Sequence, residues 1–81
     1  MNKDYILYNL KETHKQIESI INDLTTDDSY NELNYFNDMR HVYHHLNTAW
    51  NARNSSKEES MICSEEDFNK WRHFPQDLID E

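Results

Sequence analysis

The sequence predicts an all-α protein: an antiparallel helical hairpin of two long helices plus a short third helix, forming a four-helix-type bundle by dimerisation. Three observations predict this class. Apolar residues recur at three- and four-residue steps along two long segments. A few residues with turn and capping chemistry separate the two segments. The apolar stripe of the second segment is wider than one neighbouring helix can cover. We expect a single small helical domain over residues 1–81.

The first long helix is expected over residues 3–24. Asn2 stands directly before it, and asparagine is a favoured N-cap because its side-chain oxygen accepts from backbone N–H groups of the first turn. The helix has one seam of regularly spaced positions. These positions are Ile6, Leu10, Thr13, Ile17, Ile20 and Leu24.

The second long helix is expected over residues 29–53. Residues 25–28 are Thr-Thr-Asp-Asp, which favour a turn, and Ser29 with Glu32 has the spacing of a capping box. A few residues of turn between two long helices make the helices pack antiparallel. The apolar stripe spans about 160° at 100° per residue. It contains Phe36, Met39, Tyr43, Leu46 and Trp50, flanked by Tyr35, Val42 and Ala49.

The last third of the chain is expected to hold one short helix. Residues 54–63 lack periodicity and indicate a linker. A helix is expected over residues 65–74, because Ser64 and Asp67 have capping-box spacing and Pro75 cannot continue a helix. Residues 75–81 are expected to form a tail.

The composition limits how large a core the chain can build. Leu, Ile, Val and Phe make 16 of 81 residues and the formal net charge is −8, which is near the border of disorder. So few aliphatic side chains cannot readily stabilise an isolated hairpin, and we therefore expect a homodimer, with a monomeric three-helix bundle as the alternative. The expected core and interface residues are Ile6, Leu10, Ile17, Ile20, Leu24, Phe36, Met39, Tyr43, Leu46 and Trp50.

Composition also excludes several functions. The chain contains no glycine, which P-loops, dinucleotide-binding turns and nucleophile elbows require. Its lone Cys63 cannot form an intramolecular disulfide and indicates a reducing, cytoplasmic location. No apolar run exceeds residues 5–8, so we expect no membrane association. The basic residues are few and scattered, so we expect no nucleic-acid binding.

Histidines cluster in the second helix and suggest an alternative function. Asp38, His41 and His45 fall at i, i+3 and i+7, which places one carboxylate and two imidazoles on one helix face. Such a set can bind Zn²⁺ or another divalent metal. The same face points away from the apolar stripe, so we expect a solvated polar surface there and keep the metal site as the alternative. Apart from this metal, no cofactor is expected.

The remaining candidates concern binding partners. Trp50, Arg53, Phe68 and Trp71 are residue types that anchor interfaces, although their spacing also suits a helical core. Residues 55–81 carry eight acids and three bases, a net of −5, so an acidic inhibitor or immunity-type protein that binds a basic partner is a second alternative. The leading hypothesis is a non-enzymatic helical protein that acts through protein–protein interaction or assembly, with no catalytic residues.

Overall fold

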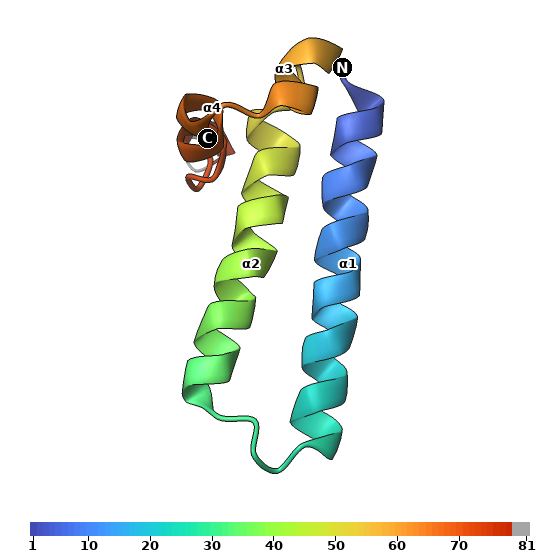
Figure 1. The fold of residues 1–81 in the computed structure, drawn as a ribbon, viewed down its shortest axis with the longest axis vertical. Coiled ribbons are helices and arrows are strands. Elements are labelled where there is room, and N and C mark those ends of the chain that lie inside the picture. Colours follow the sequence, from blue (N-terminus) through green and yellow to red (C-terminus); the bar gives the residue numbers. More distant parts are fainter. Residues whose placement is uncertain (79–81) are drawn as a thin grey trace.

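The computed structural model describes residues 1–78, and every regular element in that range is helical (Figure 1). It contains helices α1 (Lys3–Thr26), α2 (Glu32–Asn51), α3 (Lys57–Ile62) and α4 (Glu65–Trp71), followed by a 3₁₀ turn at Gln76–Leu78. The predicted all-α class, with two long helices and shorter ones, is confirmed. The last part of the predicted tail, residues 79–81, lies outside the described residues.

Helix α1 begins as predicted and ends two residues later than predicted. The Asn2 side chain accepts from the Tyr5 N–H at 3.2 Å, so it is the N-cap. At the other end, the hydroxyls of Thr25 and Thr26 donate to the carbonyls of Ile21 and Asn22 at 2.7 and 2.8 Å. These bonds satisfy both hydroxyls within the helix, which extends through Thr26.

Helix α2 begins three residues later than predicted. Its N-cap is Asn31, which forms a reciprocal capping box with Asn34. Ser29 instead donates through its N–H and hydroxyl to the Asp27 carboxylate at 3.0 and 2.6 Å. The Asp27 side chain therefore holds Ser29 in the turn, and these hydrogen bonds lower the pKa of the Asp27 carboxyl.

The predicted linker over residues 54–63 is wrong, because it contains helix α3. Ser56 and Glu59 form a capping box at its start, and Cys63 ends it in the left-handed conformation with φ of 42°. Ser64 then caps α4 as predicted, because its Oγ accepts a hydrogen bond from the Asp67 N–H at 3.1 Å. Helix α4 ends at Trp71 rather than at residue 74.

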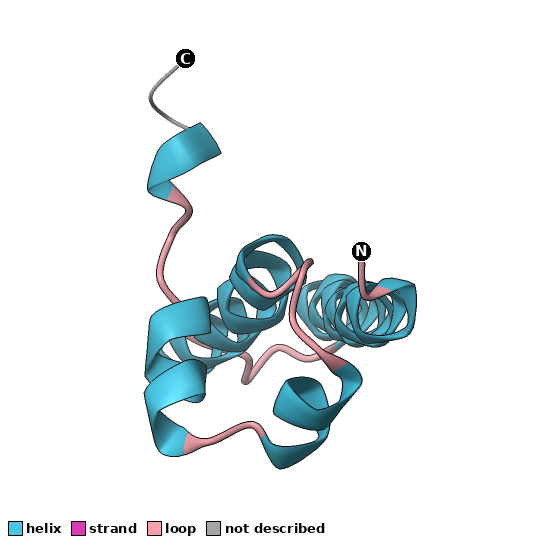
Figure 2. Cartoon of the chain, turned by 90° about the horizontal axis from the view of Figure 1, so that it is seen from above, coloured by secondary structure: helices cyan, strands magenta, loops and turns pink. Residues whose placement is uncertain are grey.

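The short helices cover one end of the hairpin. Helices α1 and α2 lie side by side and antiparallel, α3 lies near the N-terminus, and α4 packs beside α2 on the side away from α1 (Figure 1). Seen along the hairpin, α3 and α4 lie on one side, whereas the segment after α4 leaves toward the other side (Figure 2). The backbone N–H of Asn2 donates to the Arg53 carbonyl at 2.7 Å and ties the start of α1 to the end of α2.

Two asparagines of α2 anchor α4. Asn47 Nδ2 donates to the Arg72 carbonyl at 2.9 Å, and Asn51 Nδ2 donates to the carbonyls of Trp71 and His73 at 2.8 and 2.7 Å. Carbonyls at a helix C-terminus have no partner within the helix, so these amides satisfy groups that would otherwise need water. Residues 64–73 therefore pack on their own hairpin.

The two long helices meet along only part of the predicted seam. The buried positions between them are small or polar, with only a few aliphatic residues. They are Asn9, Thr13, Ile20, Val42, His45, Thr48, Ala49 and Ala52. Of the ten residues expected in the core or the dimer interface, only Ile20 is buried within the chain. Small side chains let two helix backbones approach closely, which leaves the larger apolar side chains outside this contact.

Candidate functional site

The large apolar residues of both long helices form one exposed surface. We measure angles around each helix axis at 100° per residue. Around α1, the centre of the apolar stripe lies roughly 70° from the side that faces α2. Around α2, the centre of the apolar stripe lies roughly 120° from the side that faces α1. Because the helices are antiparallel, both rotations lead to the same side of the hairpin. We call this surface the apolar face. It comprises Ile6, Leu10, Ile17, Ile21, Leu24, Phe36, Met39, Tyr43, Leu46 and Trp50.

A groove marks the end of the apolar face near the chain termini. It has a volume of about 420 Å³ and is lined by residues of both long helices and of the segment after α4. Its principal lining residues are Ile6, Leu10, Leu46, Trp50, Phe74, Pro75 and Leu78. The Trp50 indole N–H donates to the Asp77 carboxylate at 3.0 Å, which fastens the 3₁₀ turn to this edge.

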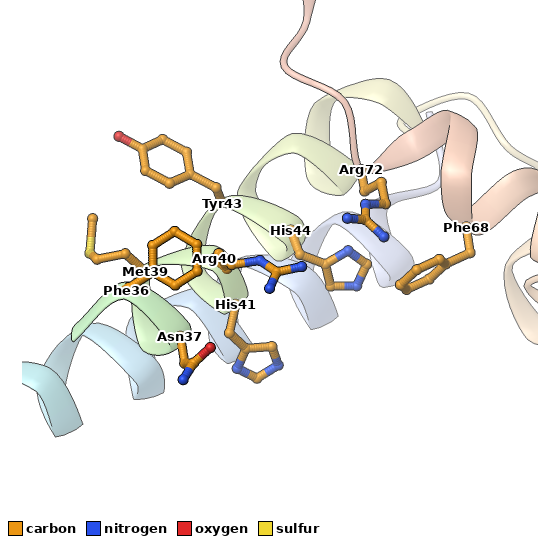
Figure 3. A pocket seen from close by; sticks show the side chains of 9 residues that line it. All are labelled: Phe36, Asn37, Met39, Arg40, His41, Tyr43, His44, Phe68 and Arg72. Carbon is orange, nitrogen blue, oxygen red and sulfur yellow. The ribbon is translucent and has the colours of Figure 1, made fainter. Parts of the chain in front are cut away.

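A second cavity lies on the outer side of α2, where the apolar face continues toward α4. Its volume is about 570 Å³. Figure 3 shows the guanidinium groups of Arg40 and Arg72 extending toward the imidazole of His44. Each guanidinium also lies near an aromatic ring, Arg40 at 5.6 Å from Phe36 and Arg72 at 5.5 Å from Phe68. This cavity thus combines aromatic walls with two cations in a chain whose net charge is −8.

His44 lies inside this cavity without a partner for one ring nitrogen. Its Nδ1 is buried and makes no hydrogen bond. Burial first, and then the positive charges of His41 and Arg72, lower the pKa of His44. These effects favour the neutral form of His44, whose ring centroid lies 4.7 Å from that of Phe68.

A chain of polar side chains crosses the contact between α1 and α2. Asn9 Nδ2 donates to the Tyr5 carbonyl, and Asn9 Oδ1 lies 2.9 Å from His45 Nδ1. His45 Nε2 lies 3.1 Å from His41 Nε2, and His41 Nδ1 lies 2.9 Å from the side-chain oxygen of Gln16. Burial, followed by the neighbouring imidazoles, lowers the pKa of His45.

The structure brings together two of the three predicted metal ligands. His41 and His45 are in contact, but Asp38 instead accepts from the Tyr30 hydroxyl at 2.6 Å. Desolvation and this bond raise the pKa of Tyr30 to about 12. Within residues 1–78, no three histidine, cysteine, aspartate or glutamate side chains are grouped to hold a metal ion. The expectation that this face is fully solvated is also wrong, because His45 is only 8% exposed against α1.

The four predicted partner-contact residues have different environments. Trp71 is 4% exposed and packs against Tyr5, so it is part of the core rather than a free anchor. The Arg53 guanidinium stacks 3.9 Å from the Trp50 ring centroid and pairs with Asp77 at 3.7 Å. Phe68 lines the cavity beside His44 and remains partly exposed.

Cys63 and the acidic residues of the last third have local structural roles. The Cys63 thiol lies 4.0 Å from the Tyr5 hydroxyl, and burial with the nearby thiol raises the pKa of Tyr5 to about 12. Acids occupy the first turns of α3 and α4, where the helix dipole favours negative charge. Capping thus accounts for much of the acidity of residues 55–78.

Sequence reasoning missed the residues that join the two long helices. These residues include Asn9 and Gln16 of α1 and Thr48 of α2. Each is polar, and polar residues on a helix are ordinarily expected to face water. The sequence offers one signal of this contact between the helices. His41 and His45 share a helix face, and the small residues Ala49 and Ala52 lie nearby.

Comparison with known proteins yields no relatives: no family model, curated protein or solved structure matches the chain. None of the described helices combines the length and apolar character needed to span a bilayer. The functional proposal therefore rests on the chain's own geometry.

Proposed function

We propose that the protein acts through protein–protein association and that its first partner is a second copy of itself, docked apolar face to apolar face. One observation carries the proposal. The largest apolar side chains of α1 and α2 lie together on one exposed side of the hairpin instead of between the helices. Two such hairpins packed face to face make a four-helix bundle.

The exposed area on this face matches what a stable dimer requires. Seven of its large side chains are 42–60% exposed: Leu10, Ile17, Ile21, Leu24, Phe36, Tyr43 and Leu46. Half-exposed side chains of this size leave on the order of 100 Å² each, so the seven leave on the order of 700 Å². A standard interface buries about 800 Å² per partner, whereas the largest apolar patch of a typical monomer is about 300–600 Å².

Charge also favours a second copy on this surface. The ten positions of the apolar face are all uncharged, although the chain as a whole carries −8. Two copies can therefore meet here without placing like charges in the contact, and their acids remain on the outer surfaces in water. Burying the same face against a strongly charged partner would leave that partner's charges without counterparts.

The test measures the oligomeric state of a matched pair of variants. Leu46 lies on the apolar face, and Leu33, which is 67% exposed, lies on a different side of the same helix. Sedimentation equilibrium of the wild type should give twice the 9.9 kDa chain mass. L46K removes two buried leucines per dimer, about 3 kcal/mol in total, so the dissociation constant should rise about 100-fold.

L33K is the control, since it changes the net charge equally but leaves the apolar face intact. It should remain dimeric at the concentrations where L46K is monomeric. A wild-type chain that stays monomeric up to several hundred micromolar, or equal dissociation of the two variants, would exclude self-association through this face.

A further inference from the structure

The contact between His41 and His45 has an unusual arrangement of nitrogen atoms. The two residues are one helical turn apart on α2, and their Nε2 atoms face each other at 3.1 Å. Each ring is held on its other side by an amide of α1, Gln16 for His41 and Asn9 for His45. Both rings are therefore oriented by partners outside their own helix.

Hydrogen bonding determines which ring nitrogens carry lone pairs. Asn9 Nδ2 donates to the Tyr5 carbonyl at 2.9 Å, so the atom that faces His45 is the Asn9 oxygen. An amide oxygen only accepts, and His45 Nδ1 must therefore carry the hydrogen. Neutral His45 then presents an unprotonated Nε2 to His41. The Gln16 oxygen has the same effect on His41, so in the neutral forms both lone pairs point into the contact.

Two facing lone pairs repel each other unless a proton or a cation lies between them. We propose that a divalent transition-metal ion occupies this contact and is bound by His41 Nε2 and His45 Nε2. At metal–nitrogen distances of about 2.0–2.1 Å, two ligands stand about 2.9 Å apart at a right angle and about 3.3 Å apart at a tetrahedral angle. The observed 3.1 Å lies between these values.

The surroundings support a bound cation. A hydrogen bond donated by Nδ1–H to the oxygen of an outer residue is the usual device that orients metal-binding histidines. His41 is exposed, so an ion can approach from solvent and keep water in its remaining coordination positions.

The nature of the ligands predicts which ions bind. Two imidazole nitrogens suit Cu²⁺, Ni²⁺ and Zn²⁺, with Cu²⁺ tightest, whereas Mg²⁺ prefers oxygen ligands. Isothermal titration calorimetry on the full chain should detect one ion per chain for Zn²⁺ and Ni²⁺ and no heat for Mg²⁺. The melting temperature should rise with Zn²⁺, because the ion binds the folded state.

Three variants test the assignment. H41A removes an exposed ligand with little risk to folding, and it should weaken Zn²⁺ binding at least tenfold. Q16A removes only the outer hydrogen bond and should weaken binding about tenfold. H73A is the matched control, because His73 is exposed and far from the pair in sequence, and it should bind like the wild type.

Failure of this site is distinguishable from failure of the dimer. Both ligands belong to one chain, and neither belongs to the apolar face, so L46K should bind Zn²⁺ with the wild-type affinity. Equal Zn²⁺ affinity in H41A and wild type would overturn the site. Absence of binding for all three transition metals would overturn it as well.

Discussion

Asn9 is the residue on which the contact between the two long helices depends most. It is 1% exposed, and its amide group uses both ends, donating to Tyr5 and accepting from His45. An asparagine at this depth is stable only because both groups are paired. The hydrogen bond to His45 then fixes the position of one helix relative to the other.

We expect Asn9→Ala to lower the free energy of unfolding by about 1–3 kcal/mol, because His45 Nδ1 loses its partner inside the contact. Urea denaturation at one fixed protein concentration measures this change. Asn22→Ala, on the exposed side of the same helix, is the control and should change stability by less than about 0.5 kcal/mol. An N9A variant as stable as the wild type would show that this bond contributes nothing net.

Individual residues were predicted well where the signal is local. The caps at Asn2 and Ser64 were predicted because an N-cap depends only on a side chain and the next three residues. The burial of Asn9 was not predicted, since it depends on which segment lies opposite in the folded chain. Of the metal set, the spacing of His41 and His45 was a sound indication of contact, whereas Asp38 was assigned without knowledge of Tyr30.

At the level of single elements, the end of α3 shows how a chain without glycine makes a tight turn. Helices commonly end at a left-handed residue, usually glycine. Here Cys63 adopts that conformation, with φ of 42°, and is the only positive-φ residue among those described. A residue with a Cβ atom pays roughly 1 kcal/mol or more for this conformation.

Cys63→Gly should therefore stabilise the protein by about 0.5–1 kcal/mol, after the greater flexibility of glycine in the unfolded chain is subtracted. Thermal denaturation followed by circular dichroism measures the gain. Cys63→Ala removes the same thiol but keeps the Cβ atom, so it should give no gain. If C63A and C63G have the same melting temperature, the left-handed conformation is not the source of the effect.

Helix α3 itself could not be found from periodicity, because six residues are too few to repeat a pattern. Its only signal in the sequence is the spacing of Ser56 and Glu59, which form the capping box. The long helices were predicted to within three residues at each end, since 24 and 20 residues give several turns of pattern.

At the level of the whole molecule, the helical wheel gives the direction of an apolar stripe but not what covers it. The sequence placed the large apolar residues of α1 and α2 correctly on one stripe each. It assigned the stripes to the core and the interface, but within the chain only some smaller members such as Thr13 and Ala49 are buried, together with His45 from outside the stripes. The apolar stripes are left exposed, and the proposed dimer is what would cover them.

The uneven placement of α3 and α4 has a consequence for how the hairpin opens. The molecule extends 43 Å along its longest axis, and the short helices, the bond from Asn2 to Arg53 and the two asparagine anchors all lie near one end. The opposite end, around Asp27 to Asn31, has only the two long helices and their turn. Local opening costs least where the fewest tertiary contacts must break.

Backbone amides should therefore exchange with deuterium in a gradient along the hairpin. Amides of residues 20–26 and 32–38 should exchange faster than those of residues 6–12 and 45–51, although all four segments are helical. Mass spectrometry of peptides after timed exchange measures this difference. Uniform protection along both helices would mean that the hairpin opens only as a single cooperative unit.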